Sequence, residues 1–264
     1  MTSTITPTDE HATVVEDDTY EFAHGTVMIL AWIVFASTAI LFARYGRTIR
    51  IGSKDTFLGE KIWFQVHRTV ALLATVLTLL GFFFILVQTQ SEWVESDEYY
   101  RFVHSTLGGI IVCCALVQAW MALFRCHPDG KFRFIYNWLH RLTGLLAFFL
   151  SVPTIFIIIA DFSTNRSGMI IILSIWSAWV VFLVIVLEVV QCFLQRSLKQ
   201  IEMKKTPELY YLRQPPFVKS DTNAANNNLS VMTPWHYVTL ILFLLHFLVS
   251  IALSIPLIII IWQQ

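Results

Sequence analysis

Residues Trp63 to Gln88, WFQVHRTVALLATVLTLLGFFFILVQ, form an apolar run long enough to cross a lipid bilayer as a helix. His67 and Arg68 stand near the start of this run. An ionisable side chain inside a membrane span is costly, so its presence there indicates a functional site. The same position, near the N-terminal end of an apolar run, is held by His24, His104 and His140. These four histidines are therefore the candidate functional residues.

The composition of the chain is that of a polytopic membrane protein. Of its 264 residues, 56% are hydrophobic and 14% are charged, whereas charged residues make up about a quarter of a typical soluble domain. The apolar composition makes the lipid bilayer the expected partner, and since the formal net charge is zero and no segment is basic enough to bind nucleic acid, none is expected. Apolar runs of about 18 residues or more predict an all-α membrane protein with six transmembrane helices, at Phe22–Ala43, Phe64–Val87, Phe102–Phe124, Leu139–Ala160, Met169–Leu194 and Pro234–Trp262.

The apolar runs divide the chain into four parts. An acidic tail, residues 1–21, precedes a five-helix region at 22–194. A linker at 195–233 begins as a basic extension of the fifth helix and becomes rich in asparagine at DTNAANNNLS, which is typical of a flexible segment. The sixth helix occupies residues 234–264.

The charges in the loops predict the orientation in the membrane. Lysine and arginine are concentrated in the first, third and fifth loops, whereas the N-terminal tail and the second and fourth loops contain few or none. Because short cytoplasmic loops are the basic ones, both termini are predicted on the non-cytoplasmic side. His24 and His104 then lie near the outer face, and His67 and His140 near the inner face. The sequence does not distinguish the plasma membrane from an endomembrane.

This topology groups the histidines into two pairs by depth, His24 with His104 and His67 with His140. Two imidazoles that face each other inside a four-helix bundle can bind the iron of one haem from both sides, since bundles hold cofactors between facing helices. The residue four positions further on shares the helix face of each histidine. Three of these residues are small and would leave room for a flat macrocycle, while the fourth is a flexible methionine: Ala71, Gly108, Gly144 and Met28. Helices one to four are therefore predicted to form a di-haem bundle.

Two other functions are compatible with the same residues. Histidines serve as proton relays or metal ligands in transporters, which would also need acidic residues within the spans or broken helices. Glu188 is the one acid deep in a predicted span. A haem-free, receptor-like membrane subunit would keep the histidines as packing residues that form hydrogen bonds between helices. His246, in the middle of the sixth span and without a partner at its depth, is interpreted in this second way.

A series of short motifs follows the chain in a fixed order: FAHG at 22–25, LFARYGR at 41–47, LGEKIWFQVHR at 58–68, HSTLGG at 104–109 with Gln118 after it, IYNWLHRLTG at 135–144 and VLEVV at 186–190. Together they resemble the eukaryotic cytochrome b561 family, most closely its branch of ferric-chelate reductases and stromal-cell-derived receptors. The resemblance covers roughly Phe22 to Leu194. In that branch the module usually follows DOMON-type extracellular domains, where this sequence has its acidic tail.

The resemblance implies two haem b (heme b) groups per chain, one bound by His24 with His104 and the other by His67 with His140. It also implies an ascorbate-dependent transmembrane oxidoreductase, which moves electrons from cytoplasmic ascorbate to a ferric chelate or monodehydroascorbate on the other side. Arg68 and Arg141 directly follow two of the ligands and are candidates for contact with a haem propionate or with ascorbate. The sequence is compatible with a homodimer but does not fix the oligomeric state.

Overall fold

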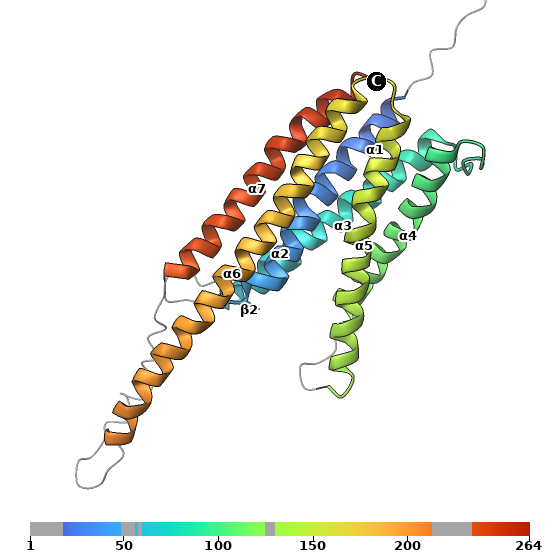
Figure 1. Ribbon diagram of the computed structural model, residues 1–264. Helices are drawn as coiled ribbons and strands as arrows, with labels where there is room; N and C mark the ends of the chain where they lie inside the picture. The colour runs from blue at the N-terminus through green and yellow to red at the C-terminus, as the bar shows by residue number, and fades with distance from the viewer. Residues whose placement is uncertain (1–17, 49–55, 58–59, 125–129, 213–233) are drawn as a thin grey trace, which may run out of the picture.

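The computed structural model describes residues 18–48, 56–57, 60–124, 130–212 and 234–264. It is almost entirely helical, and within these residues six helices are long and apolar enough to cross a membrane, at Thr19–Tyr45, Ile62–Gln88, Tyr99–Leu123, Arg133–Asp161, Arg166–Gln200 and Pro234–Ile261. The helices lie side by side in an elongated bundle (Figure 1). The predicted all-α fold with six spans is therefore confirmed.

The first span is built from three consecutive segments, which are α1 (Thr19–Ile29), the π-helical turn η1 (Leu30–Ala36) and α2 (Ser37–Tyr45). A short 3-10 turn, η2 (Gly46–Thr48), follows, and then two-residue strands β1 (Thr56–Phe57) and β2 (Glu60–Lys61) pair antiparallel. The remaining elements are long helices: α3 (Ile62–Gln88), α4 (Tyr99–Leu123), α5 (Arg133–Asp161), α6 (Arg166–Leu212) and α7 (Pro234–Ile261).

Several helices extend beyond the apolar runs that predicted them. Helix α5 begins at Arg133, not at Leu139, so His140 lies about two turns inside it. Helix α6 continues to Leu212, through the basic first part of the predicted linker. An apolar run marks only the part of a helix that suits lipid, while the backbone continues into polar sequence. The acidic tail up to residue 17 and the Asn-rich part of the linker lie outside the described residues.

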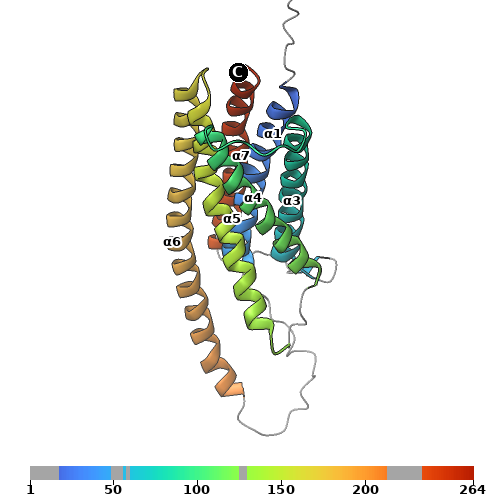
Figure 2. The same ribbon diagram turned by 90° about the vertical axis from the view of Figure 1, so that its right-hand side faces the viewer.

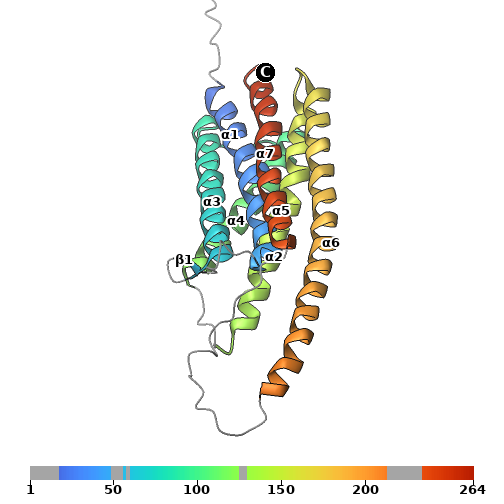
Figure 3. The same cartoon turned by 90° about the vertical axis from the view of Figure 1, so that its left-hand side faces the viewer.

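The first span lies at the centre of the bundle. It packs against α3 on one side and α7 on the other, and α6 packs against α7. Helices α4 and α5 form a close pair, and α3 and α6 lie at opposite edges of the bundle (Figures 2 and 3). We call the end where α1 begins and α7 ends the upper end, and the end where α3 and α5 begin the lower end (Figure 1).

Helix α7 is held by polar side chains that are buried against its neighbours. The His246 Nε2 lies 2.9 Å from the Ser37 hydroxyl of the first span, and both side chains are buried. On the other side, the Trp176 indole N–H of α6 donates to the Ser250 hydroxyl at 3.2 Å. Hydrogen bonds of this kind between helices stabilise bundles in lipid. The sequence suggested that His246 has no partner at its depth, whereas the structure gives it one, Ser37. His246 is still interpreted as a packing residue, because it joins α7 to the first span.

Replacing His246 by leucine should remove the bond to Ser37 without emptying the site. A hydrogen bond between membrane helices contributes about 0.6 kcal/mol on average and at most about 1.7 kcal/mol. The substitution should therefore decrease the free energy of unfolding in mixed micelles by about this amount. Ile241→Ala, an exposed change on the same helix, is the control. A His246→Leu protein as stable as this control would contradict the role of the bond.

Candidate functional site

His24 of α1 and His104 of α4 face each other across the upper half of the bundle. Their ring centroids are 6.1 Å apart and their planes meet at 78°. The Nδ1 of His24 lies 2.8 Å from the Gly81 carbonyl oxygen of α3, and that of His104 lies 3.0 Å from the Thr154 carbonyl oxygen of α5. A carbonyl only accepts, so each Nδ1 carries the proton and donates, which leaves each Nε2 with a lone pair. We call these residues the 24/104 pair.

His67 of α3 and His140 of α5 form a second facing pair, the 67/140 pair. Their ring centroids are 6.2 Å apart and their planes are perpendicular, at 90°. The His67 Nδ1 donates to the Ala39 carbonyl oxygen of α2 at 2.9 Å. Gly81, whose carbonyl oxygen accepts the hydrogen bond from His24, lies about 21 Å further along α3 than His67, at 1.5 Å of rise per residue. The two pairs are therefore well separated, one toward each end of the bundle.

The spacing within each pair suits a single metal centre between the two rings. Imidazole binds a first-row metal at about 2 Å, as it does zinc, so two imidazoles on opposite sides of one ion have centroids about 6 Å apart. Within the described ranges, no group of three or more His, Cys, Asp or Glu side chains could hold a metal ion. Each pair thus offers two ligands only, and a macrocycle that brings its own equatorial ligands fits this donor set.

The glycines near the histidines serve different purposes. A Cβ built on Gly108 would meet no atom within 4 Å, so there is open space one turn after His104. A Cβ on Gly144 would instead lie 3.4 Å from the Gln118 side-chain oxygen. This is ordinary van der Waals contact, so the face of α5 that carries Gly144 meets Gln118 of α4. Spacing of four residues identifies a helix face but not the neighbour that the face meets.

Gln118 fastens α4 to α5 beside His140. Its side-chain amide N–H groups donate to the His140 carbonyl oxygen, at 2.8 Å, and to the Thr143 hydroxyl. Sequence analysis noted Gln118 only as part of a motif. The signal that could have identified it is a lone amide in an otherwise apolar run, since a polar side chain in lipid needs a partner.

An ion-pair cluster at the upper end was also not predicted. Arg101 lies one turn before His104, and its Nε is 3.0 Å from the Asp161 carboxylate at the end of α5. The carboxylates of Glu98 and Glu21 lie 3.7 and 4.0 Å from the Arg101 guanidinium. The cluster joins α1, α4 and α5 next to the 24/104 pair. The predicted span begins at Phe102, which leaves Arg101 in the preceding loop, and its partners come from distant parts of the chain.

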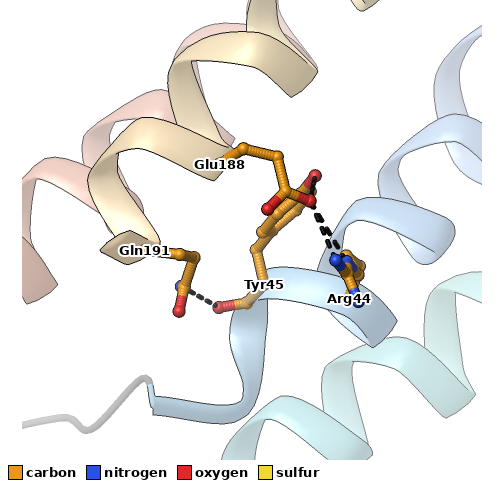
Figure 4. Close-up of polar contacts among 4 residues, drawn as sticks. All are labelled: Arg44, Tyr45, Glu188 and Gln191. Carbon is orange, nitrogen blue, oxygen red and sulfur yellow. Dashed lines mark hydrogen bonds and ion pairs between the residues drawn. The ribbon is translucent and has the colours of Figure 1, made fainter. Parts of the chain in front are cut away.

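Glu188 lies at the lower end of the first span. Its Oε1 accepts hydrogen bonds from the Arg44 guanidinium, at 3.0 Å, and from the Tyr45 hydroxyl, at 2.8 Å (Figure 4). Gln191, one turn further along α6, donates to the Tyr45 carbonyl oxygen at 3.2 Å. The sequence suggested a solitary acid within a span, whereas the structure shows an acid paired with an arginine that anchors α6 to α2. Glu188 therefore has a structural role as an anchor between α6 and α2.

Arg68 and Arg141 have exposed side chains next to His67 and His140. The Arg68 guanidinium donates to the Gln65 side-chain oxygen at 2.6 Å and lies 5.9 Å from the centroid of the Phe64 ring. Neither arginine forms an ion pair with another residue that the structure describes. Arg44, in contrast, has its charge balanced by Glu188. Two positive charges near the 67/140 pair are therefore uncompensated within the described part of the chain.

Two facing pairs of histidines inside a membrane bundle, with a ring spacing that suits a haem iron, are compatible with one class of protein, the multi-pass membrane cytochromes. A sequence profile described as eukaryotic cytochrome b561 matches residues 23–164. The chain belongs to the eukaryotic cytochrome b561 family. Membership of a b-type cytochrome family implies that the chain binds haem b and supports a role in electron transfer across the membrane.

Curated relatives resemble this chain over about half of its length. A Drosophila melanogaster protein named as a ferric-chelate reductase 1 homolog is 38% identical over 133 residues, which are 50% of this chain and 19% of that protein. Human ferric-chelate reductase 1 is 33% identical over 134 residues, 51% of this chain and 22% of that protein, and a Danio rerio relative is 28% identical over 159 residues, 60% and 26%. The matched part is thus at most about a quarter of these relatives. No solved structure matches the chain.

Gly81→Ala should disturb the 24/104 pair selectively. The added Cβ would lie 2.7 Å from Val27 Cγ2 and 3.1 Å from Met28 Cε, so α1 must move away from α3 and the bond from His24 to the Gly81 carbonyl must lengthen. Overpacking of this kind costs about 1–3 kcal/mol. Thermal unfolding and the ferric haem spectrum are the measurements.

Gly168→Ala is the matched control, since a Cβ at Gly168 meets no atom within 4 Å. It should leave both the stability and the haem spectrum unchanged. Equal behaviour of the two alanine variants would contradict the role assigned to the close approach at Gly81.

Proposed function

We propose that this chain carries electrons across a membrane through two bis-histidine b haems. The 24/104 pair binds one haem and the 67/140 pair binds the other, four axial ligands in all. The observation that carries the proposal is that both pairs have the same spacing, 6.1 and 6.2 Å between ring centroids, although their members come from four different helices. When bound, each haem supplies a one-electron redox centre.

The side chains of this protein restrict the chemistry to electron transfer. A haem held by both histidines of a pair would have no open coordination position for oxygen, so the chemistry that it would supply is electron transfer. The Nδ1–H groups of His24, His67 and His104 donate to carbonyls of neighbouring helices. Such bonds fix the tautomer and the orientation of a ligating ring and increase its basicity. The helices that carry the pairs are apolar over their membrane-spanning lengths.

The electron donor that suits the lower end is cytoplasmic ascorbate, an anion at neutral pH. Arg68 and Arg141, exposed beside the 67/140 pair, contact either ascorbate or a haem propionate in this proposal. The alternation of basic and acidic loops supports a cytoplasmic lower end and non-cytoplasmic termini. Arg44 is left out of the donor site because Glu188 already balances its charge.

The acceptor on the other side is a ferric chelate or monodehydroascorbate. The names of the relatives support a ferric chelate. The 24/104 pair lies toward the upper end, and electrons therefore travel from the 67/140 pair to the 24/104 pair. Activity as a ferric-chelate or monodehydroascorbate reductase is the enzymatic form of this proposal.

The test is the reduced-minus-oxidised absorption spectrum of the purified protein. The wild type should show a b-type spectrum that ascorbate generates, with two components. His24→Ala or His104→Ala should remove one component, and His67→Ala or His140→Ala the other, because each loss leaves an iron with a single protein ligand. His246→Leu, whose side chain packs against Ser37, should retain both components. The absence of a b-type spectrum in folded protein supplied with haem would contradict the proposal.

Arg68→Gln and Arg141→Gln should weaken reduction by ascorbate. The loss of one exposed charge interaction is worth up to about 1 kcal/mol, so the ascorbate concentration for half-maximal reduction rate should rise up to about fivefold per variant. Arg166→Gln, at the upper end, is the control. If all three variants reduce at the wild-type rate, ascorbate does not bind at Arg68 or Arg141, and this part of the proposal is wrong. The same conclusion follows if added salt changes the rate but the substitutions do not, because ascorbate is then attracted by the overall charge of the lower end and not by these two side chains.

A further inference from the structure

The ring of Tyr136 stacks on the ring of His140. Their centroids are 6.2 Å apart and their planes are nearly parallel, at 6°. Both residues lie on α5, one turn apart, so the stack runs along a single helix face. Offset parallel rings at this distance are a favourable aromatic arrangement.

Tyr136 is itself held in place by two further contacts. Its hydroxyl donates to the Met121 carbonyl oxygen of α4 at 2.5 Å. Met121 lies in the last turn of α4, where backbone carbonyls have no partner within their own helix. The Arg133 guanidinium lies 5.2 Å from the centroid of the Tyr136 ring, within the range of a cation–π contact. The Tyr136 ring therefore has a fixed position from which it can orient a neighbour.

The orientation of an imidazole plane requires a specific constraint, because rotation about the bond between Cβ and the ring has broad minima. His24, His67 and His104 are oriented by hydrogen bonds to carbonyls of other helices. The ring of His140 lies parallel to the ring of Tyr136. This plane is perpendicular to that of His67.

We propose that Tyr136 is a positioning residue for the 67/140 pair: its ring, anchored to α4 through the Met121 carbonyl, sets the plane of the His140 imidazole. This inference rests on the proposed function, since it takes His140 as an axial ligand. Tyr136 acts through His140 and does not touch the metal.

The measurement is the electron paramagnetic resonance spectrum of the oxidised, haem-loaded protein. In a low-spin ferric haem with two imidazole ligands, the spread of the g values depends on the angle between the two imidazole planes. The wild type should give two low-spin signals, and the one that His140→Ala abolishes belongs to the 67/140 pair. The signal of the 24/104 pair serves as an internal control for folding.

Two variants separate the ring from the hydroxyl of Tyr136. Tyr136→Gln keeps a donor for the Met121 carbonyl but has no ring, and it should shift the g values of the 67/140 signal alone. Tyr136→Phe keeps the ring and its contact with Arg133 and loses only the anchor to the Met121 carbonyl, so it should shift the same g values by less than Tyr136→Gln does. Phe134→Gln is the matched control on the same turn, since Phe134 is 77% exposed, and it should change neither signal.

Three results would overturn the inference. These are an unchanged 67/140 signal in Tyr136→Gln, an equal shift in Tyr136→Phe, which would assign the effect to the hydroxyl, and an equal shift in Phe134→Gln. If Tyr136→Gln does not fold, as judged by loss of the 24/104 signal, Tyr136→Met provides the same test with an apolar side chain. A wild type without low-spin haem signals would contradict the proposed function itself, which distinguishes the two failures.

Discussion

The structure depends on hydrogen bonds from histidine side chains to backbone carbonyls of neighbouring helices. His24 donates to α3, His67 to α2 and His104 to α5. A carbonyl oxygen has two lone pairs, so it can accept such a bond and still take part in its own helix. In lipid these bonds satisfy polar groups that water cannot reach. They also fix the helix positions, because each bond requires one histidine to meet one particular residue of another helix.

Close packing makes these bonds possible, and polar contacts at the two ends of the bundle hold the helices in register. Gly81 lets α1 approach α3 so that His24 can reach the Gly81 carbonyl. At the upper end, Arg101 joins α4 to α5 through Asp161. At the lower end, Glu188 ties α6 to the last turn of α2. Polar contacts between helices therefore stabilise the bundle on both sides of the histidine pairs. Such a rigid arrangement suits a site whose geometry must not change during electron transfer.

Much of the arrangement could be predicted from the sequence because depth in a membrane follows from apolar runs and loop charges. These signals predicted the six spans and grouped His24 with His104 and His67 with His140, and the structure brings the same residues together. The rotation of each helix about its axis could not be predicted in this way. That rotation decides that Gly144 meets Gln118, that Glu188 meets Arg44 and that Ser37 meets His246. Tyr136 was missed because an aromatic residue one turn from a histidine is ordinary in an apolar helix.

The central claim is that each histidine pair holds one haem, and the haem content of the purified protein tests it most directly. Extraction of the haem as its pyridine complex, together with quantitative amino-acid analysis, gives the number of haem b groups per chain. The account predicts two in the wild type, and one after either His104→Ala or His140→Ala. A single haem in fully loaded wild-type protein, or two haems retained after either substitution, would contradict it.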